Sequence, residues 1–255
     1  MPRECAFCDA KAKDTGEHVW SKWISKILPG KKRLRQLDAE RKVIRQKLSN
    51  TIDWKAPVVC HPCNTRWMSD IIENKHAKPA MSDLILDKPG TLITQERANS
   101  IALFAFKTAV ILDQLVTNRE PFFERSVRHE FRKSLSVPRN VHMWLARSAL
   151  TKRGEAGTLY HEGTTPEGGY IQTYACTFSA ACLVLQVAAF RVHGIHSVIP
   201  KNHFVVTRFW PYLAEELVWP PVFSLRTIGE FDAFADRWLT VVATQGAPLS
   251  SKLSS

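Results

Sequence analysis

The segment CHPCNTRWMSD at residues 60–70 is the most informative part of the chain, because its C-x-x-C pair is followed directly by Asn64, a residue suited to start a helix. A second C-x-x-C pair, CAFC, lies at residues 5–8. The N-terminus shows no apolar signal-peptide core, so we expect a cytoplasmic protein, in which cysteines bind metal, react or stay buried. Two such pairs predict one tetrahedral zinc site. Its expected ligands are Cys5, Cys8, Cys60 and Cys63.

The spacing of the two pairs sets the size of the unit that zinc would close. Residues 9–59 separate them, a gap of 51 residues, whereas about 15–20 residues separate the pairs of a compact zinc ribbon. Zinc is therefore expected to staple a large loop. A redox function is disfavoured, because redox C-x-x-C pairs occur singly and near a βαβ pattern. Cys176 and Cys182 lie in an apolar stretch and are predicted to be small buried side chains.

The excess positive charge is concentrated near the N-terminus. The 255-residue chain has a formal net charge of +11, and residues 1–50 hold 13 basic and 6 acidic side chains. A surplus of this kind favours a polyanion, most often nucleic acid, as partner; the alternative is an ordinary solvated face. Residues 33–48 fit either a hairpin or a charged helix, and periodicity does not decide between them. The candidate phosphate contacts are Lys31, Lys32, Arg33, Arg35, Arg41, Lys42, Arg45 and Lys47.

Three polar residues fall where a zinc frame would bring them together. Glu17 and His18 lie inside the stapled loop, and Asn64 follows the second cysteine pair. Carboxylate and amide oxygens suit Mg²⁺, and an imidazole titrates near neutral pH, so that it can deprotonate an attacking water. Together they form a minimal set for metal-assisted phosphodiester hydrolysis. Taken singly, Glu17 fits an exposed loop acid, His18 a core histidine and Asn64 a helix cap.

The combination of CAFC, the Glu17-His18 pair and CHPCN resembles HNH endonucleases with a zinc-bound ββα-metal (treble-clef) core, including phage resolvases of the endonuclease-seven kind and uncharacterised bacterial and prophage HNH-like proteins. The resemblance covers residues 3–80. It implies that the four cysteines hold structural zinc, that His18 is the general base, and that Glu17 and Asn64 bind catalytic Mg²⁺ or Mn²⁺. It also implies two strands, hence a hairpin, before a helix that carries Arg66, a further nucleic-acid contact.

The sequence departs from that family at two positions. Many members have Asp before the histidine, where this chain has Glu17, and the related group often has proline shortly after the pair, where this chain reads WSK at residues 20–22. The middle Asn of the family name has one candidate in the loop, Asn50. It either orients His18 or forms a turn, and its neighbouring serine favours the turn. His61 is a less favoured alternative zinc ligand.

The rest of the chain predicts α+β structure without indicating a chemistry. We expect a zinc-bound nuclease domain at residues 1–80, an α+β accessory domain at 81–245 and a disordered tail at 246–255. Arg125, Arg128 and Arg132 would share one helix face, which either extends the DNA contact or is solvated. Helices are predicted at 97–116, 122–134 and 231–242, strands at 141–147 and 203–209, two strands or a strand and a helix at 170–193, and a Gly- and Thr-rich loop at 153–169.

These features predict an α+β protein that acts as a metal-dependent endonuclease on duplex or branched DNA. The alternative is a zinc-finger nucleic-acid-binding module whose HNH-like site is not catalytic, and a third interpretation is an RNA-directed nuclease of a toxin or defence system. One HNH site cuts one strand at a time, so double-strand breaks would need a homodimer or two successive visits. The accessory domain would contact DNA, dimerise or bind a partner protein. No membrane span is expected, because no apolar run reaches the required length of about 20 residues.

Overall fold

The computed structural model describes residues 4–12, 17–28, 30–37, 43–49, 55–116, 119–164, 170–193, 207–212 and 217–244, which form a mixed α+β protein. The helical segments are α1 (Lys22–Ile27), α2 (His61–Cys63), η1 (Asn64–Ala77), α3 (Lys78–Ile85), α4 (Gln95–Asp113), α5 (Arg125–Ser134) and α6 (Ile228–Thr244). The strands are β1 (Glu17–His18), β2 (Lys32–Leu37), β3 (Val43–Ser49), β4 (Lys55–Ala56), β5 (Thr91–Ile93), β6 (Val141–Ser148), β7 (Arg153–Thr164), β8 (Tyr170–Ala180), β9 (Leu183–His193), β10 (Thr207–Trp210), β11 (Leu217–Trp219) and β12 (Ser224–Leu225).

One eight-stranded sheet forms the body of the molecule. Its strands follow the order β10-β6-β9-β8-β7-β2-β3, and β12 pairs with β6 as a branch. Neighbours along this order are antiparallel, except that β2 and β7 run parallel. Because β2 and β3 come from the stapled loop and β7 comes from residues 153–164, one sheet joins segments that are far apart in the sequence.

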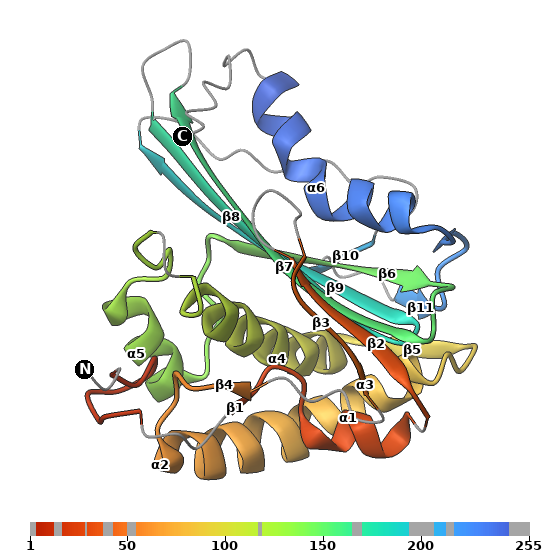
Figure 1. Ribbon diagram of the computed structural model, residues 1–255, viewed down its shortest axis with the longest axis horizontal. Coiled ribbons are helices and arrows are strands. Elements are labelled where there is room, and N and C mark those ends of the chain that lie inside the picture. The colour runs from red at the N-terminus through yellow and green to blue at the C-terminus, as the bar shows by residue number, and fades with distance from the viewer. Residues whose placement is uncertain are drawn as a thin grey trace.

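Helices cover both faces of this sheet. Figure 1 shows α4 against one face and α6 against the other. The side chains of β9 alternate accordingly: Leu185 and Val187 belong to the larger core with α4, whereas Val184 and Ala188 belong to a second core with Phe234 of α6. A strand that is buried on both faces gives a continuous apolar run in the sequence. For this reason the pattern at 170–193 shows no clean alternation, although two strands form there.

A continuous helical rod leads from the second cysteine pair along the central helix. The segments α2, η1 and α3 follow one another without interruption over residues 61–85, and η1 has the wider hydrogen bonding of a π-helix. The rod lies alongside α4 (Figure 1). All of α4 from residue 100 to 113 is buried, as expected for a helix that is apolar on most faces. Lys107 and Asp113 are buried within it.

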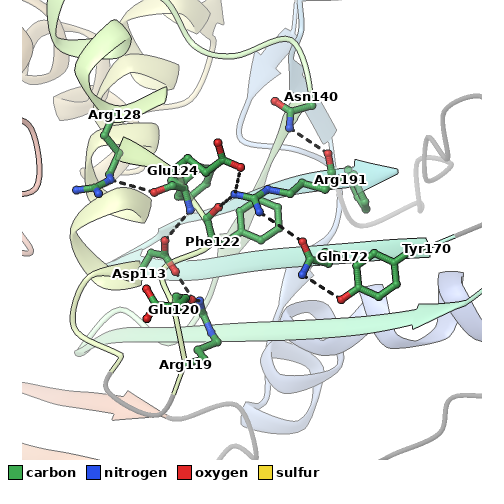
Figure 2. Close-up of polar contacts among 12 residues, drawn as sticks. Asp113, Arg119, Glu120, Phe122, Glu124, Arg128, Asn140, Tyr170, Gln172 and Arg191 are labelled. Carbon is green, nitrogen blue, oxygen red and sulfur yellow. Dashed lines mark hydrogen bonds and ion pairs between the residues drawn. The ribbon is translucent and has the colours of Figure 1, made fainter. Parts of the chain in front are cut away.

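Asp113 fixes the turn that follows α4. Its carboxylate accepts hydrogen bonds from Arg119 Nη2 at 2.8 Å and from the backbone N–H of Phe123 at 2.9 Å (Figure 2). Arg191 of β9 donates to the backbone carbonyl of Phe122 in the same turn. The turn is thereby tied to both the central helix and the sheet, which positions α5.

Most of the predicted elements are confirmed. The helices α4, α5 and α6 and the strands β6, β8 and β9 form where the sequence predicts them, and the basic segment forms a hairpin, β2–β3. The predicted loop at 153–169 is wrong for residues 153–164, which form β7. Glycine weakens an isolated strand, but β7 pairs with β2 on one side and β8 on the other, so tertiary pairing outweighs local preference. Residues 203–206 and the tail at 246–255 lie outside the described residues.

The predicted boundary at residue 80 falls inside α3. One hydrophobic core includes residues of the cysteine turn, the hairpin, the helical rod and the sheet. The segments predicted as two domains therefore pack on a shared core. Both Cys176 and Cys182 are buried in that core, as predicted. No helix in the described ranges combines the length and the apolar character needed to cross a bilayer.

Candidate metal centre and nucleic-acid interface

Four cysteine sulfurs converge where a turn near the N-terminus meets the start of the helical rod. In the turn, the backbone N–H of Cys5 donates to the carbonyl of Ala10 at 2.8 Å, while Cys60 directly precedes α2 and Cys63 is its last residue. The four Sγ atoms lie within 4.8 Å of one another, and Cys8 Sγ is 3.5 Å from Cys60 Sγ and 3.7 Å from Cys63 Sγ. Tetrahedral thiolates about 2.3 Å from zinc are about 3.8 Å apart. The cluster therefore fits Zn²⁺, as the two pairs predict.

The pKa values of Cys5 and Cys60 in this cluster are shifted in opposite directions. Hydrogen bonding with the Cys63 thiol, helped by the backbone N–H of Cys60, lowers the pKa of Cys5 to about 4. Burial raises the pKa of Cys60 to about 11. The lowered pKa favours the thiolate form of Cys5, which is the form that binds a soft cation. The charge of a bound zinc ion would deprotonate the remaining thiols, and the ion would then act as a structural cross-link.

Aromatic packing supports the cysteine turn. Phe7, which lies between the first two cysteines, is fully buried. Its ring centre is 5.2 Å from that of Trp67 on η1 and 6.3 Å from that of Phe131 on α5. Trp67 and Phe131 are themselves 5.9 Å apart. The turn is therefore held by segments from both the helical rod and the later part of the chain.

Two arginines of α5 also contact the cysteine turn. Arg125 forms an ion pair with Asp9, and Arg128 donates through Nη1 to the backbone carbonyl of Ala6. The sequence allowed either a DNA contact or a solvated surface for this arginine face. Arg125 is exposed, so its surface ion pair is consistent with a solvated face, whereas the partly buried Arg128 makes a structural contact that neither alternative includes. Arg132, the third residue of the predicted face, is exposed.

Glu17 lies in a buried ion-pair cluster. Strand β1 pairs with β4, so that His18 stands opposite Lys55. The neighbouring Glu17 carboxylate is only 2% exposed and accepts a hydrogen bond from Lys107 Nζ at 2.9 Å. The same ammonium group donates to Glu73 of η1 at 2.7 Å. One cation of the central helix is thus shared by two carboxylates, one from the stapled loop and one from the helical rod.

Burial and proximity set the charges of this cluster. Burial by itself lowers the pKa of Lys107, but the carboxylates of Glu17 and Glu73 outweigh it and raise that pKa above its ordinary value. Lys107 is therefore an ammonium group. Burial also raises the pKa of Glu17, and the positive charge of Lys107 opposes this shift. Glu17 accordingly takes up a proton more readily than an exposed carboxylate does.

The arrangement around Glu17 does not fit a catalytic Mg²⁺ or Mn²⁺. Mg²⁺ requires near-octahedral oxygen ligands and keeps several waters, whereas a Glu17 oxygen already contacts the fully buried Lys107. Asn64, the other predicted metal ligand, precedes Glu73 by nine residues on the same helical segment. The two residues are therefore separated by about two turns of that helix. Within the described part of the chain, the cysteine cluster is the only group of three or more His, Cys, Asp or Glu side chains placed to share one ion.

The other predicted site residues lie nearer the surface. His18 and Asn64 are half-buried, whereas His61 and Arg66 are exposed. His61 does not belong to the cysteine cluster. The structure thus brings the four cysteines together and joins Glu17 to Glu73 through Lys107. The predicted roles of His18 as a base and Asn64 as a metal ligand stay predictions.

The basic hairpin β2–β3 forms one end of the large sheet. Strand β3 is the edge strand, and β2 lies between β3 and β7 (Figure 1). Leu34 of β2 is fully buried in the main core, whereas Arg33, Arg45 and Lys47 are exposed. The hairpin is therefore anchored by an apolar side chain and presents cations to solvent.

The predicted basic residues differ in their accessibility. Lys31 is exposed, whereas Arg35 forms an ion pair with Glu155 of β7 at 3.4 Å and is partly buried. Arg35 is therefore engaged within the sheet. Arg41, Lys42 and Asn50, together with the side chain of Lys32, lie outside the described residues.

Sequence reasoning did not assign Lys107 to the site. Its position inside the apolar run 101–116 is nevertheless a signal, because a buried lysine requires an acidic partner. The identity of that partner is not local information: Glu17 and Glu73 are 90 and 34 residues away along the chain. Only the packing of β1 and η1 on α4 brings the three residues together.

No protein-family model, curated protein or solved structure matches this chain. Its function is therefore inferred from three features of the molecule itself: the cysteine cluster, the Glu17–Lys107–Glu73 cluster and the basic hairpin.

Proposed function

We propose that this protein binds nucleic acid, with duplex DNA as the first candidate, through the β2–β3 hairpin of a zinc-stapled frame. The observation that carries the proposal is the set of exposed cations on the hairpin: Arg45 and Lys47 on the edge strand β3, and Arg33 on β2. Guanidinium and ammonium groups are the usual partners of phosphate oxygens. The positive surplus of residues 1–50 lies in the same region of the chain.

The hairpin is held in place before any ligand arrives. Strand β2 pairs with both β3 and β7, and Leu34 is packed in the main core. The zinc cluster would close the loop that contains the hairpin. A preorganised surface loses little conformational entropy on binding. Contacts from such a surface to phosphates give affinity that falls with salt and that carries no sequence information.

A basic edge strand also has a simpler explanation, because charged side chains prevent edge-to-edge pairing between molecules. The test compares full-length, zinc-loaded proteins for binding to a fluorescein-labelled duplex by anisotropy. The hairpin variant carries Arg33→Gln, Arg45→Gln and Lys47→Gln. The matched control removes the same charges from exposed positions elsewhere, two arginines and one lysine, namely Arg139→Gln, Arg226→Gln and Lys133→Gln.

We expect the hairpin variant to lose at least about tenfold in affinity at low salt and the control to stay within about twofold of wild type. Equal losses in both variants would mean that net charge, not the hairpin, attracts DNA. An unchanged affinity of the hairpin variant would contradict the proposal and favour edge protection. Competition with RNA of the same sequence decides whether DNA is the preferred ligand.

Phosphodiester hydrolysis is the second candidate function. The observation in its favour is the position of His18, which is half-buried on β1 opposite the exposed Lys55. An imidazole so placed can act as a general base, and an adjoining lysine can contact a phosphate. The Mg²⁺ or Mn²⁺ dependence that the sequence predicts belongs to this candidate, and the contact between Glu17 and Lys107 counts against it.

Nicking of supercoiled plasmid in Mg²⁺ or Mn²⁺ tests the second candidate. The wild type is compared with His18→Ala, both zinc-loaded and both shown to be folded. Activity that is present in the wild type and lost in His18→Ala would support hydrolysis. Equal activity in both proteins would indicate a contaminating nuclease. Absence of activity in both, with DNA binding retained, would leave binding as the function.

A further inference from the structure

We propose that the ammonium group of Lys107 takes the place of a metal cation between Glu17 and Glu73, so that this cluster binds no divalent ion. The family resemblance implies that Glu17 is a ligand of Mg²⁺ or Mn²⁺, and the structure gives it a different cationic partner. The proposal is independent of DNA binding, because it concerns only the occupancy of this cluster.

Distances and burial define the cluster. Lys107 Nζ lies 2.9 Å from Glu17 Oε1 and 2.7 Å from Glu73 Oε1, distances typical of charge-assisted hydrogen bonds. The side chains of Lys107, Glu17 and Glu73 are 0%, 2% and 13% exposed. Both carboxylates therefore direct an oxygen to the same ammonium group in a site that is nearly closed to solvent.

The packing of α4 keeps Lys107 in this position. It lies in the interior of the helix between the buried residues Phe106 and Thr108, and its Nζ stands 5.1 Å from the centre of the Phe104 ring. An ammonium group that moved away from the carboxylates inside the core would lose both counter-charges without gaining water. The cation is thus part of the fold.

Charge balance opposes a second cation. One ammonium group and two carboxylates sum to a single negative charge, and burial of Glu17 favours its neutral form, which reduces even that charge. A divalent ion bound to either contacting oxygen would stand close to Nζ, where repulsion between cations is weakly screened. It would also need room for the waters that Mg²⁺ keeps. The lysine supplies the counter-charge that a metal would supply, and it links β1, η1 and α4.

The test measures Mn²⁺ binding to the zinc-loaded full chain by electron paramagnetic resonance of the free ion. Four proteins are compared: the wild type, Glu17→Gln, Lys107→Met, and the double variant Lys107→Met with Glu17→Gln. Methionine keeps an unbranched side chain of similar length and removes the charge. We expect the wild type to bind no more Mn²⁺ than Glu17→Gln. Lys107→Met should gain at least about tenfold in Mn²⁺ affinity, and the double variant should lose that gain.

Two results would overturn the proposal. The first is a wild-type Mn²⁺ site that Glu17→Gln abolishes, because Glu17 would then bind metal with Lys107 present. The second is a folded Lys107→Met protein that gains no Mn²⁺ binding. If Lys107→Met does not fold, the comparison of the wild type with Glu17→Gln decides the matter: equal binding supports the proposal. Since no readout involves DNA, failure of this proposal is distinguishable from failure of the proposed function.

Discussion

The ammonium group of Lys107 is the shared counter-charge of the buried Glu17 carboxylate and the partly buried Glu73 carboxylate, so its removal leaves both without one. Loss of one partner from a buried ion pair typically costs about 3–5 kcal/mol. We expect Lys107→Met to lower the free energy of unfolding by about that amount, as measured by urea denaturation of the zinc-loaded protein. Adding Glu17→Gln and Glu73→Gln to the same protein should restore most of the loss. If the triple variant is as unstable as the single one, Lys107 acts through packing alone.

The raised pKa of Glu17 gives a pH dependence of defined sign. A carboxyl whose pKa is raised in the folded state contributes stability that is full below its ordinary pKa of 4.5 and is lost as pH rises through the folded value. The neutral amide of Glu17→Gln does not titrate. We therefore expect the stability of the wild type relative to Glu17→Gln to decrease as the pH rises above 4.5, measured by urea denaturation. A difference that stays constant or grows with pH would contradict this assignment.

The sequence predicts residue roles where the necessary chemistry is local. Each C-x-x-C pair brings two sulfurs together within one turn, so the four cysteines that converge in the structure could be identified before the fold was known. The environment of Glu17 could not, because its partners lie on two distant helical segments. The sequence pattern suggested Glu17 as a metal ligand, and in the fold the same carboxylate forms an ion pair with Lys107.

The hairpin β2–β3 offers a test at the scale of a single element. Its two leucines face different surroundings: Leu34 is 0% exposed and Leu48 is 65% exposed. We expect Leu34→Ala to lower the free energy of unfolding by about 2–5 kcal/mol and Leu48→Ala to change it by no more than about 0.5 kcal/mol. Thermal or urea denaturation of both variants provides the measurement. Similar losses in the two would contradict the described register.

A helix or strand could be predicted from the sequence where the residues that stabilise it lie within the element itself. The central helix α4 could be predicted because its apolar run is long, and its start is capped by Thr94, which accepts a hydrogen bond from the backbone N–H of Arg97 at 3.3 Å. Strand β7 could not, because its pairing partners β2 and β8 hold it in place. The hairpin β2–β3 is an intermediate case. Its charge pattern fits a helix equally well, and the pairing of β2 with β7 favours the strands.

At the scale of the whole molecule, the shared core bears on the predicted division at residue 80. The hairpin pairs with β7, α5 contacts the cysteine turn, and Lys107 holds Glu17. A fragment of residues 1–80 lacks all three partners. We expect this fragment to remain unfolded even with zinc, as judged by poor dispersion in its amide NMR spectrum, and the full chain to unfold in one calorimetric transition. A folded fragment that binds one zinc ion would instead support two domains.

The salt dependence of DNA binding tests the central claim, that the zinc-stapled frame presents its hairpin cations to phosphates. Each phosphate contact adds about 0.9 to the slope of the logarithm of the binding constant against the logarithm of salt concentration. We expect replacement of Arg33, Arg45 and Lys47 by glutamine to reduce the magnitude of this slope by about 2.7, whereas the matched control with Lys133, Arg139 and Arg226 replaced keeps the wild-type slope. An unchanged slope in the hairpin variant would show that these cations do not contact phosphates.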